Sequence, residues 1–205
     1  QLASLERLPH VAGVAGREEG EKVRRIVDEV AGLVRRPEQC ATFLVIDGWH
    51  HIGTSNAEFE DIAEKVTEIV ADGASAHVHV IIATSRWTTM RPAIRDLIAN
   101  RLELRLGEAL DSLIDRKLQQ KLPSAPGRGL TLAGENMLLA RTSNQDIAHI
   151  CRVHTAADPV PPLKMLPAVL TPAALAAQGD VPAGEIAWGI GGRDLDTLTD
   201  RKSVV

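Results

Sequence analysis

The run Thr42-Phe43-Leu44-Val45-Ile46-Asp47 decides the fold of this chain. Its apolar and β-branched residues are unbroken over the length of one strand, which is typical of a parallel strand buried on both faces. Asp47 closes the run, and Gly48 after it favours a turn. We therefore expect a central strand whose carboxyl end carries an acidic side chain.

A second apolar strand is predicted at residues 78–83, with a helix between the two strands. That helix should begin at a capping box of Ser55 and Glu58 and stop near Gly73. The succession of strand, helix and strand predicts a right-handed βαβ unit with parallel strands. Residues 23–34 carry the apolar stripe of an amphipathic surface helix that precedes this unit.

Downstream, the pattern predicts a short helix over residues 91–99 and a half-exposed strand over 101–106, in which leucines alternate with charged residues. Apolar residues between 110 and 122 predict another helix, and residues 137–140 a last strand. The domain should close near residue 153. Six of the eleven prolines fall between Pro159 and Pro182, so residues 154–183 are expected to form an extended linker. Residues 184–205 would start a following module or form a docking segment.

Composition limits the function classes. The 205 residues are 44% apolar and 24% charged, as in one globular domain, and only 2% are aromatic. A net charge of -4 and a pI near 6.0 provide no basic footprint for nucleic acid. Cys40 and Cys151 are isolated, which favours a reduced cytosolic setting over a disulfide framework or a zinc site. The opening at Gln1, followed at once by apolar residues, favours a fragment cut from a longer protein.

Asp47 has the position of a Walker B carboxylate, which holds Mg²⁺ or its water beside nucleotide phosphates. The alternative is an aspartate that merely caps a turn at a strand end. Thr84, Ser85 and Arg86 follow the second strand, so their hydroxyls and guanidinium should lie beside Asp47 and could sense a γ-phosphate. Arg86 could otherwise be a surface arginine paired with a carboxylate.

Several segments together resemble EccC, the ATPase of type VII secretion systems in the FtsK/SpoIIIE family: residues 8–14, 43–49, 77–87, 95–97 and 101–107. The resemblance is to a middle, degenerate module of these tandem motors. It implies an α/β fold with a RecA-like P-loop NTPase sheet, predominantly parallel with flanking helices, whose amino-terminal P-loop part is missing. It also implies ATP and Mg²⁺ as cofactors at Asp47, Thr84 and Ser85.

The same resemblance implies partners and a location. Partners would be other ATPase modules of the same chain and of neighbouring protomers in a hexamer, membrane components of the secretion system, and small helical-hairpin substrates or the motor's own linker. No nucleic acid is expected. The location would be the cytoplasmic face of the bacterial inner membrane, as a soluble domain of an anchored complex.

Two departures from the family pattern limit catalysis. No G-x-x-x-x-G-K-[ST] loop occurs in the sequence, and Gly48 stands where more active relatives place a second acid. We expect ATP binding with weak or no hydrolysis. The alternative is a nonenzymatic module that recognises a peptide or linker and keeps only a vestigial nucleotide site.

Three further assignments stay open at this stage. Arg101 aligns with an arginine that reaches a neighbouring subunit's nucleotide in the family pattern, or it is an exposed strand arginine cross-paired with Glu103 or its neighbours. Trp49 and Trp87 could wall a peptide pocket or seal the core edge. The linker anchors for such a pocket would be Leu163, Met165, Leu166 and Leu170. The histidine pairs at 50–51 and 77–79 lack a third ligand at metal spacing, so we favour packing roles for them.

Overall fold

The computed structural model describes residues 2–36, 40–53, 59–154, 159–179, 181–192 and 194–201. At its centre, β1 (Thr42–Asp47) pairs parallel with β2 (Val78–Ala83), so that Asp47 lies opposite Ala83. Helix α3 (Glu60–Asp72) and the 3-10 turn η3 (Gly73–Ala76) connect the two strands. The predicted βαβ unit is confirmed, while the predicted capping box at Ser55 lies outside the described residues.

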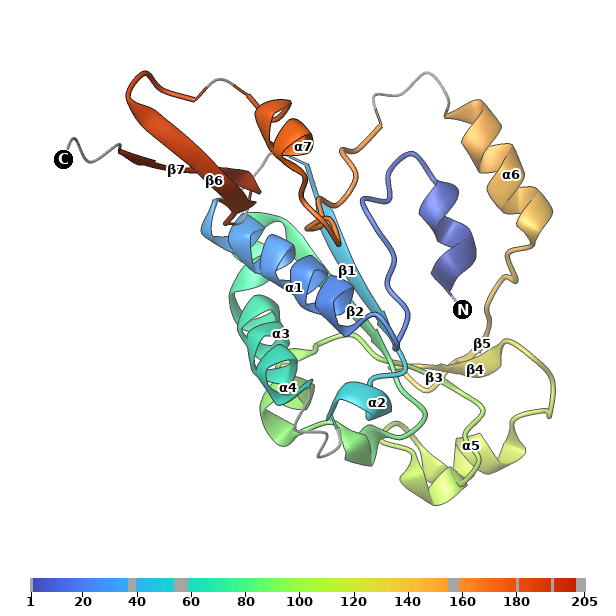
Figure 1. Ribbon diagram of the computed structural model, residues 1–205. Coiled ribbons are helices and arrows are strands. Elements are labelled where there is room, and N and C mark those ends of the chain that lie inside the picture. The colour runs from blue at the N-terminus through green and yellow to red at the C-terminus, as the bar shows by residue number, and fades with distance from the viewer. Residues whose placement is uncertain are drawn as a thin grey trace.

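One face of the β1–β2 pair forms the core. Helix α1 (Gly20–Arg35) and α3 lie side by side against it (Figure 1). Leu44 and Ile46 from β1 belong to the same buried cluster as Val66 of α3, which is fully buried. The apolar stripe predicted for the first helix therefore serves as its contact face, because residues three and four apart share one side of a helix.

The opposite face of the pair is uncovered. Phe43, Val45 and Ile81 are 60%, 45% and 51% exposed, and His79 stacks on Phe43 with ring centroids 5.1 Å apart. The prediction that the first strand is buried on both faces is wrong for this structure. The reason is that α1 and α3, the helices that pack on the pair within the described ranges, occupy the same side.

Past β2, the chain forms the 3-10 turn η4 (Trp87–Thr89), helix α4 (Pro92–Leu97) and an antiparallel sheet. The sheet has the order β3 (Leu102–Leu104), β4 (Arg128–Thr131), β5 (Asn136–Leu138). In β3 the usual burial pattern is inverted: the apolar Leu102 and Leu104 are exposed, whereas the charged Glu103 is buried, with 1% of its surface exposed.

The single helix predicted between residues 110 and 122 is wrong. The segment forms a 3-10 turn, η5 (Ala109–Asp111), and a separate helix, α5 (Arg116–Lys121). Asp115 interrupts the pattern, because its carboxylate accepts hydrogen bonds from the Lys117 and Leu118 amides and so starts a new helix.

The carboxyl-terminal part comprises α6 (Asn144–Val153), α7 (Pro172–Ala176) and a hairpin of β6 (Glu185–Gly191) with β7 (Asp196–Arg201). Helix α6 lies against η1 (Leu2–Arg7) (Figure 1). The predicted linker is not extended throughout, since α7 forms within it. Thr171 caps that helix by accepting from the Ala174 amide, and Pro172 occupies its first turn, where a missing N–H costs nothing.

The proline-rich segment runs back along the first residues of the chain. The Val160 amide donates to the Pro9 carbonyl at 2.8 Å, and the Leu163 amide donates to the Ala12 carbonyl at 2.7 Å. Arg25 of α1 reaches two carbonyls of the tail, those of Lys164 at 3.1 Å and Gly192 at 3.4 Å. The segment after α6 therefore contacts the loop after η1 and helix α1 of the same chain.

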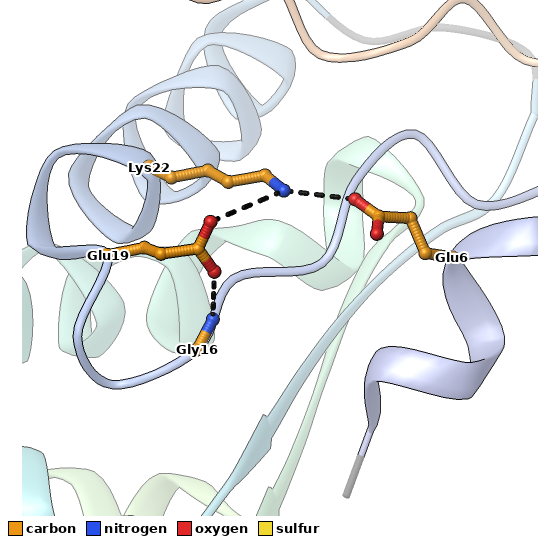
Figure 2. A network of polar contacts seen from close by, with 4 residues as sticks. All are labelled: Glu6, Gly16, Glu19 and Lys22. Carbon is orange, nitrogen blue, oxygen red and sulfur yellow. Dashed lines mark hydrogen bonds and ion pairs between the residues drawn. The ribbon is translucent and has the colours of Figure 1, made fainter.

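A polar network fixes the entry into α1 (Figure 2). The Lys22 ammonium lies 2.9 Å from Glu6 and 3.9 Å from Glu19, and Glu19 in turn accepts from the Gly16 amide at 2.7 Å. The hydrogen bond and the charge of Lys22 lower the pKa of the Glu6 carboxyl. These contacts tie η1 and the loop after it to the helix.

The two faces of β1 should differ sharply in their contribution to stability. Ile46→Ala removes a packed side chain from the core and is expected to lower the free energy of unfolding by about 2–5 kcal/mol. Val45→Ala, on the uncovered face, should cost less than about 1 kcal/mol. Urea unfolding monitored by circular dichroism measures both values, and equal losses would contradict the one-sided core.

Candidate functional site

The carboxyl ends of β1 and β2 meet at one edge, as predicted. Asp47 is exposed there, and the chain then turns across the end of β2. The amides of Gly48 and Trp49 both donate to the Ala83 carbonyl, at 3.0 and 2.9 Å. The turn thereby fixes Asp47 beside the residues that follow Ala83.

Gly48 adopts a backbone conformation that favours glycine. Its φ is +83°, and a Cβ placed there would lie 3.2 Å from Cδ2 of His51. An L-residue pays a steric penalty at such a φ. The position where more active relatives would carry a second acid therefore has a backbone that disfavours any side chain.

The loop after β2 is held by its own hydroxyl groups. The Arg86 carbonyl accepts from Thr89 Oγ1 at 2.7 Å and from Thr84 Oγ1 at 3.2 Å, and the two hydroxyls lie 3.0 Å apart. Ser85 Oγ lies 3.5 Å from Nδ1 of His50, which begins α2 (His50–Gly53). The side chains of Ser85 and Arg86 are exposed at the same edge as Asp47.

The two tryptophans have different environments. Trp49 is 1% exposed and packs in the core, and its Nε1 has no hydrogen-bond partner among the described residues. This burial matches the core-sealing alternative for Trp49. Trp87 is only partly buried, and its Nε1 donates to Glu103 Oε1 at 2.8 Å. Of the two, Trp87 is the more exposed.

Arg101 is held inward. Its Nη2 donates to the Arg95 carbonyl of α4 at 3.0 Å, and its buried Nε has no hydrogen-bond partner in the described part of the chain. The alternative of an exposed arginine paired with Glu103 is not what the structure has, because Arg101 is partly buried and Glu103 accepts from other donors. Contact with a neighbouring subunit would therefore depend on the guanidinium N–H groups that the Arg95 carbonyl does not occupy.

Asp47 could hold Mg²⁺ in the way that nucleotide enzymes do. In the described ranges no three His, Cys, Asp or Glu side chains gather to form a metal cage. Mg²⁺ beside a nucleotide needs no cage, because one or two carboxylates, waters and phosphate oxygens complete its octahedron. Asp47, Ser85 and Arg86 thus fit the metal and γ-phosphate part of such a site. The sequence lacks the loop that cradles the other phosphates.

A buried polar network around Glu103 was not predicted from the sequence. Glu103 accepts from Trp87, Ser112, Leu113 and Gln119, and the side chains of Ser112 and Gln119 are buried with it. In the sequence Glu103 looks like an ordinary solvent-facing residue of an alternating strand. No local pattern distinguishes it.

None of the helices in the described ranges combines the length and the apolar character needed to cross a membrane.

Comparisons with known proteins agree with the strand-end motifs. The model of the FtsK/SpoIIIE family matches residues 1–148. The ESX-4 secretion system protein EccC4 of Mycobacterium tuberculosis is 34% identical over 217 residues, covering 92% of this chain and 17% of that protein. The ESX secretion system protein EccC of Thermomonospora curvata is 33% identical over 215 residues, covering 85% of this chain and 16% of that protein. The chain thus spans about a sixth of these relatives.

Solved structures agree with this similarity to EccC proteins. ATPases 2 and 3 of Thermomonospora curvata EccC, in complex with a signal sequence peptide, are 30% identical with a TM-score of 0.78. The match covers 98% of this chain and 43% of that one. The cytoplasmic domain of the same type VII secretion ATPase gives a TM-score of 0.78 at 31% identity, covering 98% and 28%. The predicted RecA-like α/β class is confirmed, and the family implies nucleotide and Mg²⁺ use in general. The chain belongs to the FtsK/SpoIIIE family, and its similarity is to the ATPase modules of EccC proteins from type VII secretion systems.

Proposed function

We propose that this chain is a degenerate, middle ATPase module of a type VII secretion motor, which binds ATP with weak or no hydrolysis. The observation that carries the proposal is the edge shared by Asp47, Ser85 and Arg86, with Gly48 at a positive φ. A carboxylate and a guanidinium at adjacent parallel strand ends are suited to Mg²⁺ and a γ-phosphate. The absence of a second acid removes the group that would orient attacking water.

In this role the module would help to drive or regulate the export of small helical substrates. Its partners would be other ATPase modules of the same chain and of neighbouring protomers in a hexamer, together with membrane components of the system. It would work at the cytoplasmic face of the inner membrane. Support comes from the EccC relatives, which are named as components of secretion systems.

A nonenzymatic module that recognises a peptide or linker is the second candidate. It is favoured by the two backbone hydrogen bonds that the proline-rich segment makes to Pro9 and Ala12 of the same chain. Of the proposed anchors, Leu163 and Met165 are partly buried, whereas Leu166 is 50% exposed. Trp87 would then serve as a wall of a peptide site.

The loss of the Asp47 carboxylate should weaken nucleotide binding at this module. Asp47→Asn is expected to lower Mg²⁺-dependent photolabelling by 8-azido-ATP at least about tenfold, because the metal would lose a charged protein ligand. The labelled peptide is mapped by mass spectrometry in the full-length gene product, so that other modules are counted separately. Asp72→Asn, an exposed carboxylate at the far end of α3, is the matched control.

The same preparation separates the two candidates. If millimolar nucleotide leaves this module unlabelled, the nucleotide role fails. A fluorescent peptide of residues 159–171 that binds the wild type, and loses affinity in Trp87→Ala but not in Trp188→Ala, would then support the recognition module. Trp188 is a suitable control because it is 65% exposed on the separate hairpin.

Restoring the second acid should not restore turnover. Gly48→Glu is expected to leave the rate of ATP hydrolysis unchanged and to destabilise the fold, since a side chain at φ +83° costs about 1–2 kcal/mol. Thermal unfolding of Gly48→Ala, with Gly107→Ala as the control, measures the combined cost of the positive φ and of the 3.2 Å approach to His51, because a Cβ at Gly107 meets nothing within 4 Å. A gain in phosphate release by Gly48→Glu would overturn the backbone argument.

A further inference from the structure

A buried carboxylate lies directly behind the loop that carries Arg86. Each carboxylate oxygen of Glu103 accepts two hydrogen bonds. Oε1 accepts from Trp87 Nε1 and the Leu113 amide, each at 2.8 Å, and Oε2 accepts from Ser112 Oγ at 2.7 Å and Gln119 Nε2 at 3.2 Å. A buried carboxylate is tolerated only when its lone pairs are satisfied, and four donors meet that need.

The partners of Glu103 are themselves fixed. Ser112 Oγ accepts from the Ile114 and Asp115 amides at 3.2 and 3.1 Å, so its proton is directed at Glu103. The Gln119 amide is oriented by two backbone groups, because Nε2 also donates to the Leu104 carbonyl at 3.1 Å and Oε1 accepts from the Leu106 amide at 3.2 Å. Networks with every member satisfied hold a single geometry.

One of the four donors belongs to a different part of the fold. Leu113, Ser112 and Gln119 follow β3 in the chain, whereas Trp87 comes directly after Arg86. The Arg86 carbonyl is already held by Thr84 and Thr89. The indole contact therefore anchors the loop at a second point, and it ties β3, which directly follows Arg101 in the chain, to the loop that carries Arg86.

We infer that Glu103 is a positioning residue, which acts through Trp87 to keep Arg86 in place beside Asp47. The inference rests on the proposed function, in that the task of Arg86 is contact with a nucleotide phosphate. The positioning of the loop does not depend on that function. The Glu103 carboxylate of β3 sets the position of the loop over residues 84–89, and without this carboxylate Arg86 loses its fixed location.

Hydrogen exchange in the 205-residue chain tests the positioning itself. Glu103→Gln keeps the shape but replaces one of the two acceptor oxygens by an N–H donor. In one orientation that donor faces Ser112 and Gln119, and in the other it faces the N–H groups of Trp87 and Leu113, so either orientation sets donors against each other and weakens the network that holds the indole. We expect exchange of the Trp87 indole proton and of the Thr89 and Met90 amides, which bond within the loop, to become at least about tenfold faster. Amides in the middle of α1 should be unchanged.

Asp115→Ala is the matched control for that measurement. It removes the cap of α5 in the same neighbourhood and leaves the indole contact in place. Equal acceleration of the loop amides in both variants would reduce Glu103 to a general structural residue and overturn the inference. Unchanged loop amides in Glu103→Gln would overturn it as well.

A double-mutant cycle tests the consequence for nucleotide binding. In the full-length gene product, Glu103→Gln should weaken photolabelling of this module about three- to tenfold when Arg86 is present and less than about twofold in an Arg86→Ala background. Equal losses in both backgrounds would contradict action through Arg86. Absence of labelling in the wild type would refute the proposed function instead, and the exchange measurement would still decide whether Glu103 positions the loop.

Discussion

The parallel pairing of β1 with β2, packed on one side by α1 and α3, is the constraint on which the rest of the structure depends. Side chains alternate along a strand, so burial of Leu44 and Ile46 directs Phe43, Val45 and Asp47 to the other face. A register slip of one residue would bury Asp47 and expose the core. The hydrophobic contacts that hold the fold therefore also decide where the acidic group lies.

This alternation links the candidate site to the uncovered face. Phe43, Val45 and Ile81 form an apolar surface of a kind that isolated domains rarely expose without a purpose. Asp47 belongs to the same face at its carboxyl end. Any element that packs on Phe43 and Val45 therefore lies next to Asp47, where the phosphates of a nucleotide would need further donors. An element that extends the sheet on this face would therefore also add groups to the candidate site.

Sequence patterns predicted the elements whose packing is local and regular. The two central strands, the helix between them and the shared edge of Asp47 and Arg86 follow from apolar runs and from the handedness of βαβ units. Burial of β1 on both faces could not be tested by pattern, because a continuous apolar run does not reveal whether a second layer exists within the chain. The assignment of Arg101 depends on contacts with α4 that no spacing encodes.

The positions of buried polar groups were harder to predict from the sequence than those of buried apolar groups, for a physical reason. A buried apolar residue is identified by its type, whereas a buried carboxylate such as Glu103 is stabilised only by donors that arrive from distant positions in the chain. Asp115 likewise divided a predicted helix because its side chain bonds the next backbone amides, which competes with helix continuation. In both cases hydrogen bonding outweighed the hydrophobic pattern.

In the proposed function, the balance between binding and turnover would follow from how these polar groups are used. Arg101 is committed to the Arg95 carbonyl, the hydroxyls of Thr84 and Thr89 to the Arg86 carbonyl, and Gly48 to a turn that disfavours a side chain. Turnover requires groups that are stronger partners for the transition state than for the ground state. The side chains of Asp47, Ser85 and Arg86 are exposed at this edge, and the proposed function would use them to hold a phosphate rather than to activate water against it.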